Sequence, residues 1–347
     1  MTNQRTYNVA VVGATGAVGT QILRLLEERN FPVNQLKLLS SARSAGAKLT
    51  FKGQEVTVQE ATPESFEGVD FALFSAGGSV SKLLAKEAVQ RGAVVIDNTN
   101  AFRMAQDVPL VVPEVNMDKA FENQGIIANP NCSTIQMVAA LNPIREKFGI
   151  DRIIVSTYQA VSGAGARAIN DLVNQTKSAL AGEEVRGEIL PVGSLPKKHQ
   201  MAFNVVPQID VFQDNGFTLE EMKMINETKK IFGDDTVKVS ATCVRVPVLN
   251  GHSESVYVET KEDFTIEEVK ELLAQAPGVT LVDVPEEQGY PLATDSTGKL
   301  DVFVGRVRKD VSEPRGLHMW IVSDNLLKGA AWNAVQIAEQ MILKSDE

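Results

Sequence analysis

The residue best placed to do chemistry is Cys132, in the segment Asn129-Pro-Asn-Cys-Ser-Thr-Ile-Gln136. The apolar run at 126–128 predicts a strand, the proline keeps the residue before it extended, and Asn131 can cap a helix whose first turn carries the cysteine. The N–H groups and positive dipole end of a helix favour thiolate over thiol, so a free-cysteine pKa of about 8.5 can fall there. We therefore predict that Cys132 is a nucleophile. The alternative is a small buried core residue, the place of most free cysteines.

One histidine and two arginines could assist this cysteine. His252 comes in a strand and turn downstream, and an imidazole can act as general acid and base near neutral pH. Thiolate and base together suit covalent catalysis on an acyl or aldehyde carbon, with hydride transfer from the adduct giving a thioester. Arg103, just after a predicted strand, and Arg245 indicate an anionic substrate, although most loop arginines are simply solvated.

The first strand of the chain leads into a glycine-rich turn. Residues 6–12 predict a buried strand, and a helix through Ile22, Leu25 and Leu26 follows the turn. Strand, turn and helix N-terminus together form a cradle for a pyrophosphate, although a glycine turn that merely packs is the alternative. The spacing is G-x-x-G-x-x-G rather than G-x-G-x-x-G. The predicted cradle residues are Gly13, Thr15, Gly16, Ala17, Val18 and Gly19.

The end of the next strand, 36–39, indicates which dinucleotide is bound. An NAD site usually has an acidic residue here, whereas hydroxyls and a guanidinium suit the 2′-phosphate of NADP. The residues present are Ser40, Ser41, Arg43 and Ser44, so NADP is favoured, with a solvated Arg43 as the alternative. A further strand, 70–75, ends at Ser75 and Gly77, which we place on the same cofactor edge.

The alternation of strands and helices before the cysteine predicts an α/β fold, a Rossmann-like doubly wound parallel sheet. Beyond it the pattern changes to α+β with a mixed or antiparallel sheet. Residues 236–248 alternate, with 251–258 returning as their partner strand, and 302–307 and 317–322 form a final antiparallel pair. The apolar stripe of the last helix should pack on the first domain. We predict a nucleotide-binding domain of residues 1–131 plus 325–347, and a catalytic and dimerisation domain of residues 132–324.

Composition excludes several classes of function. The 347 residues carry a net charge of −10, and no basic run exceeds two residues, which argues against nucleic acid or an anionic membrane as partner. The start does not resemble a signal peptide and no stretch reaches eighteen apolar residues, so we expect a cytoplasmic protein. Two distant cysteines and three scattered histidines form neither a disulfide framework nor a zinc site, so no metal is expected.

Five segments, taken together and in order, resemble the aspartate-semialdehyde dehydrogenases, in particular their Gram-positive-type bacterial branch. They are residues 13–19 (GATGAVG), 41–46 (SARSAG), 129–134 (NPNCST), 158–165 (YQAVSGAG) and 245–252 (RVPVLNGH). The resemblance covers essentially the whole chain. It implies the two-domain architecture of glyceraldehyde-3-phosphate dehydrogenase and a homodimer formed through the second domain, sometimes paired into tetramers.

The resemblance also implies roles for individual residues. Cys132 would carry the acyl thioester, with Gln159 orienting it and His252 as acid and base. Arg245 would hold the substrate carboxylate and Glu220, rather than its neighbour Glu221, the amino group. Arg103 and Lys223 would form the phosphate site, Asn131 would line the substrate site, and the nicotinamide half of NADP would lie by Ser162, Gly163 and Asn325. From the residues alone, Glu220 and Lys223 are an ordinary surface ion pair.

The implied reaction is the reversible, NADPH-dependent conversion of L-aspartyl 4-phosphate to L-aspartate 4-semialdehyde and phosphate. It feeds lysine or diaminopimelate, methionine and threonine synthesis. The nearest alternative, N-acetyl-glutamyl-phosphate reductase, typically has Pro-Gly-Cys-Tyr at the nucleophile and no use for an amino-group contact. A non-catalytic NADP-binding paralogue, a cysteine hydrolase and a short-chain reductase using Tyr257 and Lys261 are more distant alternatives.

Overall fold

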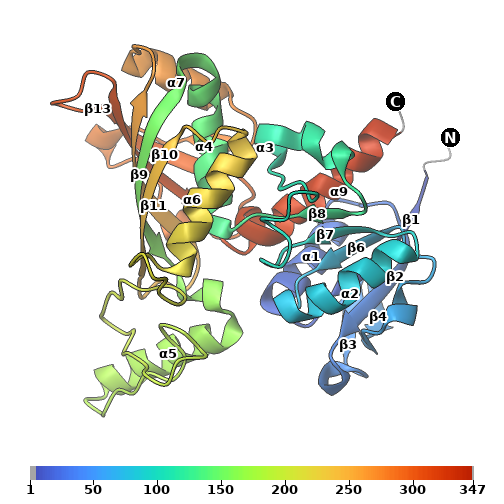
Figure 1. Ribbon diagram of the computed structural model, residues 1–347. Coiled ribbons are helices and arrows are strands. Elements are labelled where there is room, and N and C mark those ends of the chain that lie inside the picture. Colours follow the sequence, from blue (N-terminus) through green and yellow to red (C-terminus); the bar gives the residue numbers. More distant parts are fainter. Residues whose placement is uncertain (1–4, 346–347) are drawn as a thin grey trace. The chain divides into compact units, whose positions relative to one another are not determined.

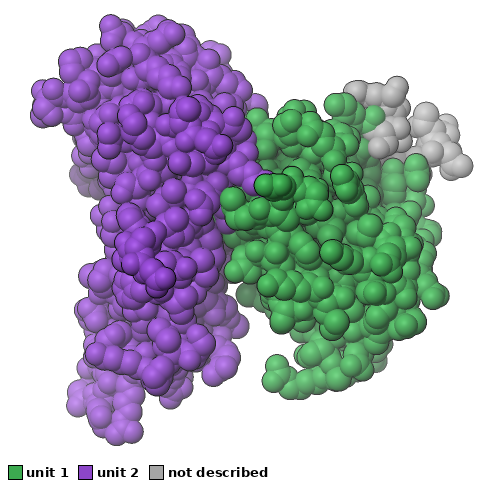
Figure 2. Space-filling model, viewed as in Figure 1, with its two compact units in different colours: residues 1–131, 330–347 green, residues 132–329 purple. Residues whose placement is uncertain are grey.

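The computed structural model describes residues 5–345 (Figure 1). The chain divides into two compact units, residues 1–131 with 330–347 (unit 1) and residues 132–329 (unit 2), which Figure 2 shows in different colours. The sequence predicts that the chain returns to the first domain at residue 325, whereas in the structure unit 1 resumes at residue 330. Residues 1–4 and 346–347, which the predicted first domain includes, lie outside the described residues.

Unit 1 is built on a parallel sheet with strand order β5-β2-β1-β6-β7-β8, which confirms the predicted doubly wound fold. The inner strands β1, β6 and β7 are short apolar runs buried almost throughout, as expected of strands with helices on both faces. The strands are β1 (Tyr7–Val12), β2 (Val33–Ser40), β5 (Gln59–Glu60), β6 (Phe71–Phe74), β7 (Val94–Asp97) and β8 (Ile126–Ala128).

The helices of unit 1 follow its strands and include the last helix of the chain. They are α1 (Ala17–Glu28), α2 (Gly78–Gln90), α3 (Pro113–Asn116) and α9 (Trp332–Ser345). Helix α9 contacts α1 and strands β6 and β7, burying Ala334 and Ile337, so the predicted packing of the last helix on the first domain is confirmed. Strands β3 (Lys48–Phe51) and β4 (Gln54–Thr57) form a separate antiparallel hairpin.

Unit 2 contains a mixed six-stranded sheet in the order β10-β9-β11-β14-β13-β12, as predicted for this half of the chain. Its strands are β9 (Ile150–Gln159), β10 (Lys238–Arg245), β11 (His252–Thr260), β12 (Val279–Leu281), β13 (Val302–Lys309) and β14 (Gly316–Ser323). Its helices are α4 (Cys132–Phe148), α5 (Ala166–Leu180), α6 (Leu219–Phe232), α7 (Ile266–Gln275) and α8 (Ala293–Ser296). The predicted final antiparallel pair is β13 with β14.

The predicted pairing of 236–248 with 251–258 is wrong. Strand β9 lies between β10 and β11, parallel to the first and antiparallel to the second. The connection at 246–249 crosses the end of β9, where the N–H of Val246 donates to the carbonyl of Gln159 at 3.0 Å. Alternating hydrophobicity shows which face a strand buries but not which strand lies beside it. As a result the ends of three neighbouring strands, β10, β9 and β11, lie side by side where the prediction had two.

The two faces of the unit 2 sheet differ. Helices α4, α6 and α7 pack against one face, and α4 contributes most of its length to the core. The opposite face carries the partly exposed Ile154, Tyr158 and Trp320, and the last two rings lie 5.5 Å apart. Across the described part of the chain, none of the helices combines the length and apolar character needed to span a bilayer.

Candidate active site

Helix α4 begins at Cys132, where the sequence predicts it. Residues such as Ile135, Val138 and Leu141 are fully buried along the helix, whereas Cys132 stays partly exposed. The other free thiol, Cys243 on β10, is buried, and burial together with the nearby Glu220 carboxylate raises its pKa. Because only the thiolate is nucleophilic, Cys132 has the setting of a reactive cysteine and Cys243 that of a core residue.

The last residue of unit 2 packs directly on this cysteine. A Cβ built on Gly329 would lie 2.8 Å from the Cβ of Cys132, closer than real side chains approach. Residue 329 therefore has to be glycine for the helix start to keep its place. Gly329 belongs to a π-helical segment, Leu327–Ala331, a kind of irregularity that is frequent at functional sites.

Three predicted site residues form a row across the ends of β10, β9 and β11. Arg245 lies directly opposite Gln159 in the β9–β10 ladder, and the register of β9 with β11 brings His252 to the other side of Gln159. All three are buried, with exposed fractions of 4%, 1% and 0%. Neighbouring residues in such a row have their Cβ atoms about 5 Å apart, so the three side chains share one small region.

Gln159 connects this row to the nucleophile and to α6. Its Nε2 donates to the hydroxyl of Ser133, next to Cys132, at 2.6 Å, and approaches Glu220 Oε1 at 3.3 Å. Cys132 also lies close enough to Arg245 for a cysteine thiolate to favour the charged guanidinium. The structure thus brings together the residues that the family resemblance assigns to one site. They are Cys132, Gln159, Glu220 and Arg245.

Glu220 and Lys223 form an ion pair of 3.1 Å, but it is not the surface pair that the residues alone suggest. The two side chains are 7% and 17% exposed, and Lys223 also pairs with Asp210 at 3.0 Å. Burial lowers the pKa of Lys223, but the two carboxylates outweigh it and the net shift is upward. Lys223 therefore stays a cation. Asp210 has no signal in its own loop segment that could have predicted this contact.

The neighbouring Glu221 is occupied elsewhere. Its carboxylate accepts the N–H of Thr218 at 2.6 Å, in a capping box that starts α6, and the N–H of Cys243 at 3.0 Å. A carboxylate with two backbone partners is a structural group, which leaves Glu220 as the one facing Gln159. The Thr-x-x-Glu spacing of residues 218–221 is a capping signal that was readable in the sequence.

The predicted nicotinamide-side residues of unit 2 lie next to this row. Asn325 donates to the Ser162 hydroxyl at 2.9 Å and accepts the N–H of Gly251 at 3.0 Å. A Cβ on Gly163 would approach Arg245 Nη1 at 3.0 Å and His252 Nε2 at 3.3 Å. Gly163 therefore lies so close to both functional groups that a side chain at this position would crowd them.

His252 differs from the expectation of a group that titrates near neutral pH. Burial, and to a smaller extent the Arg245 charge, lowers its pKa to about 3, with Glu220 acting in the opposite direction. Its Nδ1 accepts the N–H of Ala160 at 3.1 Å, while its Nε2 has no hydrogen-bond partner among the described residues. His252 is therefore a neutral imidazole with one unused nitrogen.

Another buried carboxyl group is that of Glu254, which lies two residues after His252 on the same face of β11. Glu254 is fully buried, and neither oxygen has a hydrogen-bond partner in the described part of the chain. Burial raises its pKa well above the usual value, and the Gln136 side chain only partly opposes this. Burial therefore favours the protonated, neutral form of Glu254.

We expect Glu254→Gln to stabilise the protein increasingly as the pH rises. The folded state holds this proton to a higher pH than the unfolded chain does, so the wild type loses stability above the unfolded pKa of about 4.3, and an amide has no such loss. The measurement is Tm of both proteins at pH 5 and pH 8. The Tm of Glu254→Gln minus that of the wild type should be larger at pH 8 than at pH 5. Glu262→Gln, a control on the exposed loop after β11, should differ from the wild type by the same Tm at both pH values. A difference that narrows with pH contradicts a protonated Glu254.

In unit 1, the predicted cofactor residues lie at the carboxyl ends of β1, β2 and β6. Gly13 has φ +85°, and a Cβ there would meet the backbone of Ala76 at 2.9 Å. Gly19 is even more restricted, since its Cβ would collide with the carbonyl of Gly13. A turn this tight, opening α1 with exposed Thr15 and Gly16, fits a bound pyrophosphate.

The remaining predicted cofactor residues surround this turn. The hydroxyls of Thr15 and Ser40 are 3.2 Å apart, and Arg43, three residues after Ser40, is exposed. Ser75 donates its hydroxyl to the carbonyl of Val12 at 3.0 Å, and Gly77 has φ +97° at the start of α2. Ala17 and Val18 lie in the first turn of α1, while Ser41 and Ser44 flank Arg43.

Arg103 is also in unit 1 and is buried rather than solvated. Its guanidinium donates to the carbonyls of Asn129 at 2.9 Å and Asn98 at 3.0 Å. It is thereby fixed against the segment that leads to Cys132, in which Asn131 is also buried.

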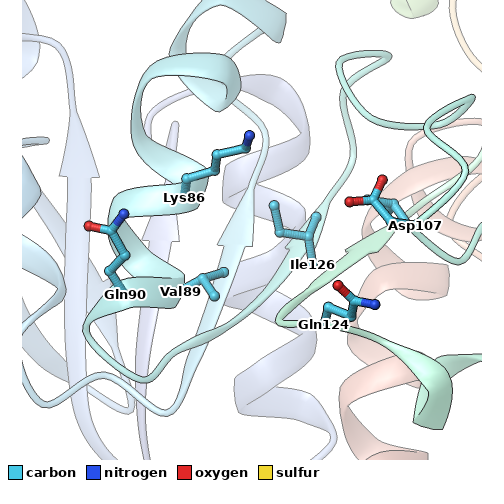
Figure 3. A pocket seen from close by; sticks show the side chains of 7 residues that line it. Lys86, Val89, Gln90, Asp107, Gln124 and Ile126 are labelled. Carbon is cyan, nitrogen blue, oxygen red and sulfur yellow. The ribbon is translucent and has the colours of Figure 1, made fainter.

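Unit 1 also contains a cavity of about 260 Å³ that none of the predicted cofactor residues lines (Figure 3). Lys86, Val89 and Gln90 of α2 line one side and Ile126, the first residue of β8, another, with Asp107 and Gln124 nearby. It lies at the amino end of β8, and ligands of open α/β sheets bind at the carboxyl ends. It is therefore not the dinucleotide site.

Comparison with known proteins identifies the family. The model for the semialdehyde dehydrogenase NAD-binding domain matches residues 8–123, and that for the semialdehyde dehydrogenase dimerisation domain matches residues 141–328. Aspartate-semialdehyde dehydrogenase of Bacillus subtilis is 64% identical over 97% of this chain and 98% of its own length. The chain belongs to the aspartate-semialdehyde dehydrogenase family. Unit 1 contains the nucleotide-binding domain of this family and unit 2 the dimerisation domain.

Other members of the family agree with this assignment. The Aquifex aeolicus enzyme is 57% identical over 97% of this chain and 98% of its own. The crystal structure of Vibrio cholerae aspartate semialdehyde dehydrogenase II complexed with ASA has a TM-score of 0.93, at 49% identity and 99% coverage of both chains. That of the Candida albicans enzyme with NADP has a TM-score of 0.74, at 28% identity, covering 98% of this chain and 99% of that one.

Proposed function

We propose that this protein catalyses the reversible, NADPH-dependent reductive dephosphorylation of L-aspartyl 4-phosphate to L-aspartate 4-semialdehyde. The observation that carries the proposal is the partly exposed Cys132 at a helix start, beside the row of Arg245, Gln159 and His252. Its relatives are named for the semialdehyde, and one was crystallised with ASA. The reaction belongs to the lysine or diaminopimelate, methionine and threonine pathways.

Cys132 would attack the C4 carbonyl carbon of the acyl phosphate. The new C–S bond forms as the C–O bond to phosphate breaks, and phosphate leaves with the electron pair of that bond. The helix start stabilises the thiolate before this step, and it stabilises the same thiolate again when the aldehyde is released. Gln159, held between Ser133 and Glu220, would orient the resulting thioester. NADPH, when bound, supplies the hydride that reduces this thioester.

The charges around the site suit a substrate with three ionised groups. Arg245 is buried and its Nε has no hydrogen-bond partner among the described residues, so it can bind the α-carboxylate. Glu220 would take the α-amino group. Lys223, with Arg103 of unit 1, would bind phosphate, and Lys223 would then share its charge between Asp210 and the substrate. Asn131 would line the site next to Cys132.

NADP is proposed rather than NAD because a guanidinium and hydroxyls follow β2 where an acidic residue would select NAD. The cradle of Gly13, Gly16 and Gly19 would hold the pyrophosphate. Ser162, Gly163 and Asn325 would lie by the nicotinamide half.

Arg43→Ala is expected to raise KM for NADP by about 10-fold or more, since a charged hydrogen bond contributes roughly 1.5–3 kcal/mol. KM for NAD, which has no 2′-phosphate, should change little. The measurement is initial rates with both cofactors, and Arg186→Ala, which removes another exposed arginine, in unit 2, is the control. Equal effects on both cofactors would remove Arg43 from the 2′-phosphate.

We further propose a cytoplasmic homodimer or dimer of dimers. The partly exposed apolar face of the unit 2 sheet, with Ile154, Tyr158 and Trp320, supports a subunit contact there. A cytoplasmic location agrees with two free thiols, because Cys132 must remain reduced to react.

The test of the proposed function is an assay of NADP reduction with aspartate semialdehyde, with and without phosphate. We expect turnover that depends on phosphate. N-acetylglutamate semialdehyde is the comparison substrate, and it should react at least about 100-fold more slowly because Glu220 cannot pair with an acylated nitrogen. A preference for the acetylated substrate would favour N-acetyl-glutamyl-phosphate reductase instead.

A further inference from the structure

Asp210 lies in a segment that is fixed to the candidate active site on both sides. Before it, Val206 exchanges two backbone hydrogen bonds of 2.9 Å with Arg245, the last residue of β10. After it, the carbonyl of Val211 accepts the N–H of Leu219, the first residue of α6, at 2.8 Å. The backbone around Asp210 therefore has a defined place between the end of β10 and the start of α6.

The conformation of Asp210 itself suits few residue types. Its φ is +67°, in the left-handed region, which aspartate, asparagine and glycine adopt more readily than other residues do. The carboxylate supports this conformation, because its Oδ1 accepts the N–H of Val211 at 2.9 Å. The other oxygen, Oδ2, is then the one that reaches α6, where it pairs with Lys223 at 3.0 Å.

The ammonium of Lys223 is shared between two carboxylates. It donates to Asp210 and, at 3.1 Å, to Glu220 Oε2. An ammonium has three donors, so one N–H of Lys223 is left for a ligand. Two carboxylates on one cation give the group a net negative charge. The remaining N–H attracts an anion, but the excess negative charge repels it.

The two carboxylates differ in their surroundings. Glu220 is 7% exposed and accepts from Gln159 Nε2 at 3.3 Å, whereas Asp210 is 30% exposed. In the proposed function Glu220 binds the α-amino group of the substrate. Asp210 is then the carboxylate that stays on Lys223 when phosphate binds to the same ammonium.

We propose that Asp210 is a positioning residue that sets the affinity of the phosphate subsite through Lys223. Its carboxylate holds the Lys223 ammonium in one place, and its negative charge keeps phosphate binding weak enough for phosphate to leave. This inference rests on the proposed function for the placement of phosphate at Lys223.

A reversible reaction has a use for this combination. Phosphate is a product in one direction and a co-substrate in the other, so a subsite that binds it too tightly retains the product. A lysine without a carboxylate partner would attract phosphate more strongly, but its long side chain would lose more rotamer freedom on binding. The single carboxylate of Asp210 orders the lysine and limits the affinity at the same time.

Two substitutions separate these effects. Asp210→Asn removes the charge but keeps an oxygen that can accept from Lys223, and asparagine tolerates the left-handed backbone. Asp210→Gly also allows φ of +67° but removes both the charge and the acceptor. The matched control is Asp214→Asn, which removes the charge of an exposed aspartate from the turn that follows in the same loop.

The measurement is the dissociation constant of inorganic phosphate, by titration calorimetry on the full-length protein. We expect Asp210→Asn to bind phosphate about 3- to 10-fold more tightly than the wild type, since a like charge near the anion is lost. Asp210→Gly should bind at least about 3-fold more weakly than Asp210→Asn, and Asp214→Asn should match the wild type. A merely structural Asp210 would make the Asn variant bind more weakly. That result, equal affinities in the Asn and Gly variants, or no measurable phosphate binding would overturn the proposal.

The same pair of substitutions in a Lys223→Gln background tests whether Asp210 acts through the lysine. Without the ammonium there is nothing to position, so Asp210→Asn and Asp210→Gly should bind phosphate equally. A difference between them that persists in this background contradicts the positioning role.

Steady-state kinetics distinguish this inference from the proposed function. With aspartate semialdehyde, KM for phosphate should fall in Asp210→Asn by the same factor as the dissociation constant, while KM for NADP stays unchanged. Failure to turn over aspartate semialdehyde would remove the proposed substrate and leave the phosphate affinities to decide the inference. An active enzyme whose phosphate affinity does not increase in Asp210→Asn would remove the inference and leave the function.

Discussion

Cys132→Ser is expected to lower phosphate-dependent turnover of aspartate semialdehyde by at least about 10⁴-fold. A serine hydroxyl is close in size to the thiol, so the contact with Gly329 and the start of α4 should be preserved. The hydroxyl, however, does not ionise at neutral pH even at a helix N-terminus. A helix start that stabilises a thiolate is of no use to a group that remains protonated.

Steady-state rates and mass spectrometry of the acylated enzyme measure this prediction. The wild type incubated with acyl phosphate should gain the mass of one aspartyl group, and the variant should not. Cys243→Ala is the matched control, because its thiol is buried on β10 and its loss should lower Tm while leaving kcat within about threefold. Acylation of Cys132→Ser at the wild-type rate would disprove the covalent route.

The second large effect is expected from Arg245→Leu. We expect kcat/KM for aspartate semialdehyde to fall about 10²–10³-fold, because a buried guanidinium bound to a carboxylate contributes roughly 2–5 kcal/mol when its loss leaves the partner charge unpaired. Nη1 of Arg245 also holds the carbonyl of Ala160 at 2.8 Å, so kcat should fall together with the rise in KM.

Arg245→Lys should recover part of the activity, since it keeps the charge but not the forked geometry. Kinetics with aspartate semialdehyde and with an analogue lacking the α-carboxylate provide the measurement. The analogue should react equally slowly with the wild type and Arg245→Leu. A normal preference for the carboxylate in the variant would show that another cation binds it.

Much of the fold was readable because local patterns decide it. Parallel strands buried on both faces are continuous apolar runs, and β1, β6 and β7 are of this kind. The start of α4 at Cys132 follows from the proline and asparagine before it. The order of strands in unit 2 depends instead on long-range pairing, so the insertion of β9 between β10 and β11 had no local signal.

The sequence predicted which residues belong to the site better than it predicted their burial and their charge states. Glu220, Lys223 and His252 are named by motif and spacing, but their burial arises only when α6, β9, β10 and β11 pack together. The low pKa of His252 and the pairing of Lys223 with Asp210 both depend on that burial. The separate use of Glu221 in the capping box could have been inferred from residues 218–221 alone.

The contact between Gly329 and Cys132 has a consequence for the architecture of the chain. These are the last and first residues of unit 2, so its two ends meet in space. Unit 2 therefore has the form of a domain insertion, entering and leaving the polypeptide of unit 1 at a single point. A circular permutation that opens the exposed loop at 182–184 would leave the contact between Gly329 and Cys132 intact, and with it the position of the nucleophile.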